Sequence, residues 1–397
     1  TWASLVAFEL HARGHAVTVV RAENAIEAVG APLKAPALPA PGRVLVGRDM
    51  SGAVLATQQD AIVYALGNHF GYHSEIPRLL AEAPGVVVLH DAEMSGFLHF
   101  WHALSPRGTV PGPGTPLLPW FAARATGAVV HSRFYAEGVR AACTGQTRVL
   151  QLAFFDLDVA PPRRRRPQSR LVIATIGEAN PNKRHEAVID AIGLVPALCA
   201  GTTYRVLGHA SPARQAELQS RADALGVEIE FKGWLTLDDL RTAVAETDVL
   251  CCLRWPVTEG ASGSAALALL SGRPVMVPDV GSFIDLPDEF VLRVPAGNET
   301  PTLAGYLLTL FHHPEIGERR GSAARAWARE TFLVTHYVDR LLPLLHQATA
   351  AAPMIALMRG FEAEAASFGL PPDDPLIMRS RTTAERSFGL IDPSRDR

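Results

Sequence analysis

The chain has 397 residues, 48% of them hydrophobic, and a formal net charge of -3 at pH 7. This length favours two domains over one core, and the hydrophobic content excludes a largely disordered chain. The slightly negative charge argues against a general nucleic-acid binder, which is normally basic. The four cysteines include no CxxC pair, which argues against a disulfide framework or a zinc site and favours a reducing, cytoplasmic setting. No apolar run reaches the length of a bilayer, and no basic and apolar leader opens the chain.

The first half alternates short apolar strands with helices. Trp2 to His11 has helical spacing and is followed by a predicted strand at Ala16 to Val20. A domain of this type normally begins with a strand and a glycine-rich turn before that helix, so we expect that the chain starts inside its first domain. Further strands and helices are predicted at Ala61–Leu66, Ile76–Ala83, Val86–Leu89, Ala128–Val130, Phe134–Ala142 and Val149–Ala153. Pro, Ala and Gly make loops of Ala31–Gly42 and Ser105–Pro119.

The stretch Ala160 to Arg170, APPRRRRPQSR, has the composition of a linker. A solvated hinge is the favoured interpretation of its four arginines, and contact with an anionic membrane surface is the alternative. The domain boundaries predicted from these patterns are 1–160, a linker at 161–170, a second domain at 171–335, and C-terminal helices with a polar tail at 336–397.

The second half has a stricter strand–helix alternation, which predicts a parallel, doubly wound α/β sheet. Its predicted elements are Leu171–Ile176, Ala187–Val195, Tyr204–Leu207, Arg214–Leu225, Ile229–Phe231, Leu237–Ala245, Val249–Leu253, Pro274–Val277 and one or two helices over Ala323–His346. The strand Val249–Leu253 is followed by a loop with Arg254 and one carboxylate, Glu259. Ser262, Gly263 and Ser264 then open a helix whose free N–H groups and positive dipole end suit a phosphate.

Glycines follow other strands of this half, where ligands of open α/β sheets bind. Gly177 to Lys183, GEANPNK, follows the first strand, with a lysine suited to a diphosphate but without a P-loop. Gly208 and Gly233 follow the next two strands. Each glycine is weak evidence alone, because turns need glycine, but their recurrence favours a ligand crossing the sheet edge.

Histidine-containing segments follow three strands of the first half. They are Asn68 with nearby His73, then His90 with Asp91, then His131 with Ser132. The alternative for each histidine is a bond to a neighbouring carbonyl. His90 is the favoured candidate, because it follows an apolar run and precedes a carboxylate.

Several chemistries lack their motifs. The chain contains no GxSxG elbow, no HExxH and no GxGxxG with an acidic residue downstream. His90, Asp91 and Asp279 are not spaced as metal ligands, so a reaction that needs neither metal nor cofactor is the simpler interpretation.

Taken together, these residues resemble the retaining glycosyltransferases of the nucleotide-sugar family four, from about Trp2 to His346. The family signature is a Glu, seven residues, a second Glu and then Gly-x-Pro-Val; Glu259 matches the first Glu and Gly272 to Val275 match the turn. The second Glu falls on Leu267. The segments GNHFGYH, VVVLHD and VVHSRF resemble a bacterial subgroup of surface-polysaccharide transferases.

The resemblance implies a GT-B architecture, with two Rossmann-like doubly wound parallel-sheet domains facing across a cleft. It implies that Glu259 orients the donor sugar and that His90 lies beside the reacting sugar. Gly177 and Lys183 match the diphosphate site, whose Arg is replaced by Glu178. Gly233 matches the turn near the base, and Leu267 replaces the carboxylate that holds the ribose.

The resulting prediction is transfer from a nucleotide-sugar donor to a saccharide or lipid-linked acceptor, with catalytic His90, Glu259 and Lys183. The setting predicted is cytoplasmic, at the inner membrane face. One alternative, motivated by Leu267, Glu178 and the missing first strand, is a degenerate fold that binds nucleotide sugars or acts as a scaffold. A sugar-nucleotide epimerase and, last, a nicotinamide oxidoreductase are weaker alternatives.

Overall fold

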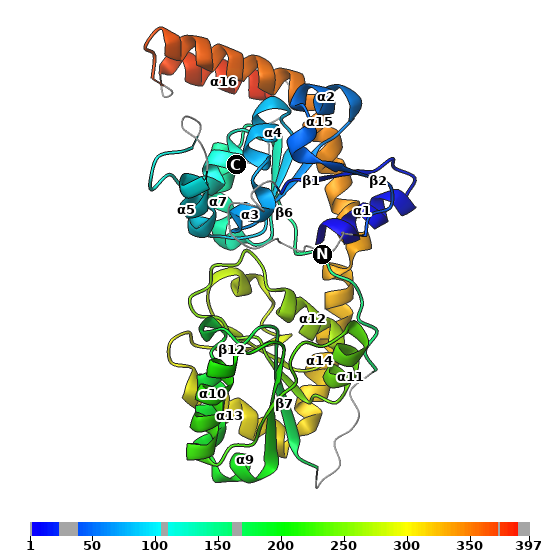
Figure 1. Ribbon diagram of the computed structural model, residues 1–397, viewed down its shortest axis with the longest axis vertical. Helices are drawn as coiled ribbons and strands as arrows, with labels where there is room; N and C mark the ends of the chain where they lie inside the picture. The colour runs from blue at the N-terminus through cyan, green and yellow to red at the C-terminus, as the bar shows by residue number, and fades with distance from the viewer. Residues whose placement is uncertain (1, 24–38, 105–109, 161–168, 372–373, 388–397) are drawn as a thin grey trace. The chain divides into compact units, whose positions relative to one another are not determined.

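The computed structural model describes residues 2–23, 39–104, 110–160, 169–371 and 374–387. Parts of the predicted loops at 31–42 and 105–119, most of the linker at 161–170 and part of the C-terminal tail lie outside these residues. The chain divides into two compact units (Figure 1). The first contains Ala3–Leu150 and Val338–Arg397, and the second contains Gln151–Tyr337.

The first unit is built on parallel strands. Its elements are α1 (Trp2–Ala12), β1 (Thr18–Arg21), β2 (Arg43–Val46), η1 (Gly47–Asp49), α2 (Gly52–Gln58), β3 (Val63–Leu66), α3 (Phe70–His73), α4 (Ile76–Glu82), β4 (Val86–Leu89), α5 (Ser95–Leu104), α6 (Leu117–Ala122), β5 (Gly127–Val130), η2 (Arg133–Tyr135), α7 (Ala136–Ala142), β6 (Thr147–Val149), most of α15 (Val334–Ser367) and α16 (Pro375–Ser387). Four strands form one sheet in the order β3-β4-β5-β6, and β1 pairs with β2 separately. All these pairs are parallel.

Burial explains why the central strands of this sheet are uniformly apolar. All four residues of both β4 and β5 are buried. An aromatic group packs over them, with Phe97 against Trp101 and Phe121 at ring separations of 5.5 and 5.6 Å. The sheet is therefore covered on both faces, as parallel sheets are.

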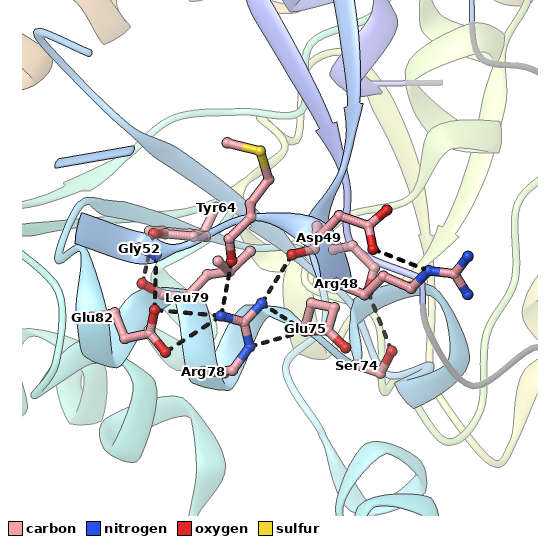
Figure 2. Close-up of polar contacts among 12 residues, drawn as sticks. Arg48, Asp49, Gly52, Tyr64, Ser74, Glu75, Arg78, Leu79 and Glu82 are labelled. Carbon is pink, nitrogen blue, oxygen red and sulfur yellow. Dashed lines mark hydrogen bonds and ion pairs between the residues drawn. The ribbon is translucent and has the colours of Figure 1, made fainter. Parts of the chain in front are cut away.

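Arg78 of α4 joins this helix to the segment after β2 (Figure 2). Its guanidinium donates to the backbone oxygens of Gly47 and Met50, at 2.9 and 3.1 Å, and to the Glu75 carboxylate at 2.9 Å. Glu82 accepts from Arg78 and also from the backbone N of Gly52, at 2.8 Å, at the start of α2. Arg78 thus attaches the segment between β2 and α2 to helix α4.

The second unit is a six-stranded parallel sheet with helices. Its elements are β7 (Leu171–Ile176), η3 (Pro181–Lys183), α8 (His185–Gly193), α9 (Pro196–Gly201), β8 (Thr202–Leu207), α10 (Pro212–Leu225), β9 (Ile229–Phe231), α11 (Leu237–Ala245), β10 (Val249–Cys251), α12 (Gly263–Ser271), β11 (Val275–Pro278), η4 (Gly281–Asp285), β12 (Val291–Val294), α13 (Glu299–His312) and α14 (Pro314–Phe332).

The strand order of the second unit is β12-β11-β10-β7-β8-β9. The chain therefore builds one half of the sheet outward from β7 and then returns to build the other half outward from β10. Ile173 of β7 pairs with Val249 of β10 at the junction. Ligands of open α/β sheets bind beyond the carboxyl ends of the strands at such a switch point.

Arg273, in the turn after α12, occupies the variable position of the Gly-x-Pro-Val signature. Its side chain is 1% exposed and donates to the backbone oxygens of Thr247, Ser271 and Ala245. Burial lowers its pKa to about 10. These bonds place Arg273 near the amino ends of β10 and β11, at the edge of the sheet opposite to the strand ends that carry the candidate site.

The C-terminal region, predicted as helices with a polar tail at 336–397, contains a helix inside that tail. α15 runs without a break to Ser367, and α16 occupies Pro375–Ser387. Among the described residues, α15 alone is long and apolar enough, by length and composition, to cross a membrane. Because 44% of its most apolar window is buried in the protein, packing accounts for part of that character. The helix predicted from Phe134 begins instead at Ala136, after the 3-10 turn η2.

Candidate functional site

Lys183 lies at the switch point, after β7. It is 6% exposed, and its Nζ donates to the backbone oxygen of Ile176 at 2.8 Å. Burial, together with the nearby positive charge of Arg254, lowers the pKa of Lys183 to about 8. The lysine is thus a partly desolvated cation whose charge a bound anion would stabilise.

Two predicted glycines lie at the ends of β7 and β8, and one of them adjoins this lysine. Gly177 has a φ of +98°, and a Cβ there would lie 2.2 Å from the Lys183 Nζ. At Gly208 a Cβ would lie 2.3 Å from the backbone oxygen of Gly177. A side chain at Gly208 would therefore collide with the backbone at the end of β7. At Gly177 the positive φ favours glycine, and a Cβ would displace the end of the Lys183 side chain.

The loop after β10 contacts the loop that carries Lys183. The backbone N of Trp255 donates to the backbone oxygen of Asn182 at 2.8 Å. Arg254, 6% exposed, donates to the Glu259 carboxylate at 3.2 Å and to the Leu253 backbone oxygen at 2.9 Å. Arg254 is thus a second cation held in a fixed position at the switch point. The side chain of Glu259 remains partly exposed.

The helix α12 begins at Gly263 with Ser262 as its N-cap, as predicted. The Ser262 Oγ accepts from the backbone N of Ala265 at 3.3 Å and lies 3.0 Å from the Ser264 Oγ. At Gly263 a Cβ would meet Phe154 at 3.5 Å, an ordinary contact, so no steric reason for glycine is found there.

Leu267 is buried in the core of the second unit. It is 4% exposed and packs in a buried cluster with Val277 and Phe283. A carboxylate at this position would be buried among apolar side chains, at a high free-energy cost. Helix α12 therefore has no ribose-binding group at position 267.

Arg184 and His185 follow Lys183 in the chain and make polar contacts that the sequence patterns did not single out. The Tyr204 hydroxyl lies 2.9 Å from the Thr175 Oγ1 and 2.7 Å from the His185 Nδ1, and burial lowers the pKa of His185 to about 3. Arg184, with a φ of 58°, makes two bonds to Glu299 at 2.8 and 2.9 Å. This ion pair holds a strained residue next to Lys183. The only sequence signal was a run of charged residues after β7.

An aromatic pair lies on the same half of the sheet. Trp234, after β9, is 82% exposed, and its ring stacks on that of His209, after β8, at 6.1 Å and 24°. Gly233 has a φ of +66°, and a Cβ there would meet no heavy atom within 4 Å. The exposed indole has the properties of a platform for a planar ligand group.

The first unit brings together the three histidine-bearing strand ends. The His90 Nδ1 lies 2.9 Å from the His131 Nε2, and the His131 Nδ1 lies 2.8 Å from the backbone oxygen of Leu150. For His131, the alternative of a bond to a neighbouring carbonyl is therefore correct. Burial, then His131 and then His73, lower the pKa of His90 well below its usual value.

Asn68 and Asp91 tie two of these strand ends together. The backbone N of Asn68 donates to Asp91 Oδ2 at 2.6 Å, and Asn68 Oδ1 accepts from the backbone N of Phe97 at 2.7 Å, near the start of α5. Asn68 thus has a structural role as a helix cap. Burial, then His69, lower the pKa of His73 to about 4. The Ser132 hydroxyl is buried and finds no hydrogen-bond partner in the part of the chain that the structure describes.

No group of three or more His, Cys, Asp or Glu side chains among the described residues could hold a metal ion. Independence of metals and cofactors stays a prediction, as do the individual roles of the candidate residues.

Solved structures similar to this chain share one fold. TarM matches with a TM-score of 0.54 and 14% identity, over 72% of this chain and 55% of TarM, so the chain spans about half of that protein. The Anabaena protein HepE, in complex with UDP and glucose, matches with 0.59 and 19%, over 87% and 95%. WaaG, a glycosyltransferase involved in lipopolysaccharide biosynthesis, matches with 0.56 and 15%, over 85% and 94%. The expected GT-B fold with Rossmann-like domains is thereby confirmed.

The sequence identifies the second unit more specifically. Residues 170–313 match the family described as glycosyl transferases group 1. Among curated proteins, none matches this sequence. The chain is therefore a GT-B protein that carries a glycosyl transferases group 1 domain.

Proposed function

We propose that this protein is a retaining glycosyltransferase that moves a sugar from a nucleotide-sugar donor to a saccharide or lipid-linked saccharide. The observation that carries the proposal is the meeting of Lys183, Arg254 and Glu259 at the switch point of the second unit. This constellation lies within the residues that match the glycosyl transferases group 1 family.

The charges of this site suit a diphosphate. Lys183 and Arg254 are both largely buried cations, and the N-terminus of α12 begins at the end of the same loop. Positive groups fixed before the reaction stabilise the negative charge that develops on a leaving diphosphate, because they need no reorganisation. In the proposed mechanism, the acceptor hydroxyl attacks the anomeric carbon on the face from which the diphosphate leaves, and Glu259 orients the donor sugar.

A nucleobase fits the exposed ring of Trp234. Stacking requires only a flat π-face, so it leaves the choice of base open. HepE has been crystallised with UDP and glucose, so UDP-sugars are the first donors to test. By its involvement in lipopolysaccharide biosynthesis, WaaG supports a role in cell-surface polysaccharide synthesis. A cytoplasmic setting at the inner membrane face is part of the proposal.

Two variants test the proposal. Lys183→Ala and Glu259→Gln are expected to lower transfer by at least about 100-fold, measured as release of UDP from UDP-sugars over a saccharide acceptor panel. The matched control is Lys232→Ala, because this lysine is partly exposed and paired with Glu230 at 2.8 Å. The anomeric configuration of the product, read by NMR, tests retention.

The buried Leu267 favours one second candidate, a protein that binds nucleotide sugars without transferring them. Calorimetry of the unmodified protein with UDP and UDP-sugars separates the two. Binding that Lys183→Ala abolishes, with no hydrolysis or transfer to any acceptor, would favour the binding protein. Equal turnover in the two site variants and the unmodified protein contradicts the transferase.

A further inference from the structure

A chain of hydrogen bonds links His90 to the protein backbone through His131. The His131 Nδ1 is 2.8 Å from the Leu150 backbone oxygen, and its Nε2 is 2.9 Å from the His90 Nδ1. The two imidazole rings lie 4.9 Å apart and are inclined by 31°. Each of these contacts joins residues of the first unit.

The Leu150 carbonyl at the end of this chain of hydrogen bonds determines which ring nitrogen donates at each step. A carbonyl oxygen can only accept, so the Nδ1 of His131 carries the hydrogen. A neutral imidazole has a single N–H, so the Nε2 of His131 accepts and the Nδ1 of His90 donates. Burial lowers the pKa of His131 to about 4, which keeps this imidazole neutral at pH 7. The remaining ring nitrogen of His90, Nε2, then carries a lone pair.

The core of the unit fixes the position of His131. The residue is 0% exposed and directly follows β5. Its backbone N donates to the Tyr135 hydroxyl at 2.7 Å, and that hydroxyl donates to the Leu89 backbone oxygen at 2.6 Å. Because β4 and β5 are paired in register from Val86 to Leu89, the two histidines that follow them are held side by side.

We propose that His131 is a positioning residue that fixes His90 in its Nδ1–H tautomer, so that the Nε2 of His90 accepts a hydrogen bond from a substrate hydroxyl. The identity of the substrate rests on the proposed function, but the tautomer does not. The consequence for specificity is that the sugar group meeting His90 must donate a hydrogen. A hydroxyl satisfies this requirement, whereas an ionised carboxylate, as in a uronic acid, is rejected.

The tautomer itself can be observed. An imidazole with no such partner favours the opposite Nε2–H form, so finding Nδ1–H at His90 is diagnostic. The experiment uses the full chain with ¹⁵N-labelled histidine and two-bond ¹H–¹⁵N correlation spectra at pH 7, which distinguish protonated from unprotonated ring nitrogens. The spectrum of His90→Asn assigns the His90 signals.

Three variants separate positioning from packing. In His131→Leu the acceptor is lost, and His90 is expected to change to the Nε2–H form. In His131→Gln the side-chain oxygen can take the place of Nε2 and is expected to retain Nδ1–H. Tyr135→Phe removes a neighbouring hydroxyl without touching the imidazole pair, so it is expected to lower the melting temperature and leave the tautomer unchanged.

The outcomes are distinct. Nε2–H at His90 in the unmodified protein overturns the inference without needing any variant, as does an unchanged tautomer in folded His131→Leu. If transfer is detected, His131→Leu is expected to lower kcat about tenfold, the effect of one lost hydrogen bond, with little change in KM, and His131→Gln to recover most of it. Absence of transfer together with Nδ1–H contradicts the proposed function but leaves the inference intact.

Discussion

Replacing Lys183 by methionine is expected to stabilise the protein at neutral pH while it removes donor binding. The pKa of this lysine falls from 10.5 to about 8 on folding. At about 1.4 kcal/mol per pKa unit, the buried cation costs the folded state about 3 kcal/mol at pH 7. Methionine fills similar space but loses the bond to the Ile176 backbone oxygen, which contributes about 1 kcal/mol. The net expectation is a gain of about 2 kcal/mol.

The sign of the pH dependence follows from the same shift in pKa. Because the folded-state pKa of Lys183 lies below its unfolded value, the unfolded chain binds more protons between pH 8 and 10.5. The free energy of unfolding of the unmodified protein therefore rises with pH across this window. The advantage of Lys183→Met is expected to be largest below pH 8 and to shrink as the pH increases.

Urea unfolding at several pH values between 7 and 10, followed by circular dichroism, measures this difference. Lys232→Met is the control, since this lysine is 38% exposed. The difference in free energy of unfolding between Lys232→Met and the unmodified protein should not show the pH dependence expected for Lys183→Met. A variant Lys183→Met that is less stable at pH 7, or a difference that is independent of pH, would refute the reasoning. Calorimetry with UDP checks the accompanying loss of binding.

Three further outcomes are expected. Trp234→Ala should weaken UDP binding about tenfold, since one base–aromatic stack contributes about 1–3 kcal/mol; unchanged calorimetric affinity contradicts the platform. Gly208→Ala should lower the free energy of unfolding by about 1–3 kcal/mol or more, because its Cβ would lie 2.3 Å from the Gly177 oxygen, whereas Gly305→Ala, with open space around it, should not. Arg78→Ala should lower the melting temperature, because the Gly47 oxygen loses its guanidinium donor; an unchanged thermal transition contradicts that role.

Regular, strongly patterned elements of this chain could be predicted from the sequence. The predicted bounds of β4, β7, β9 and α11 agree with the structure, because each has an uninterrupted apolar or amphipathic pattern. Short elements such as α3 and β12 were missed. A single turn of helix, as at Phe70–His73, has no period to detect, and its formation depends on packing.

At the C-terminal end, long ordered elements were missed. The hydrophobic pattern weakens beyond Ala351, inside α15, and the composition of α16 is polar, so the sequence did not indicate the ordered helices found there. Propensity is a weak signal when tertiary contacts supply the stability. Arg359, for example, donates to the backbone oxygens of Arg124 and Ala125, far away in the sequence.

The candidate site could be predicted where its residues directly follow a strand. Parallel strands deliver their carboxyl ends to one edge, so Lys183 and Glu259 could be placed near one another from order alone. The pairing of His90 with His131 could not, because it depends on side-chain rotamers. The same holds for Glu299, whose bond to Arg184 joins residues 115 positions apart.

The switch point also has a consequence for the order of folding. The strands that carry the candidate diphosphate site, β7 and β10, pair between Ile173 and Val249, so their junction closes only after the chain between them has collapsed. Each half of the sheet can form local strand–helix contacts earlier. A nucleotide that needs both halves finds no site in partly folded chains. We therefore expect UDP to slow the unfolding rate of the second unit and to leave its refolding rate nearly unchanged, which stopped-flow measurements with and without UDP can check.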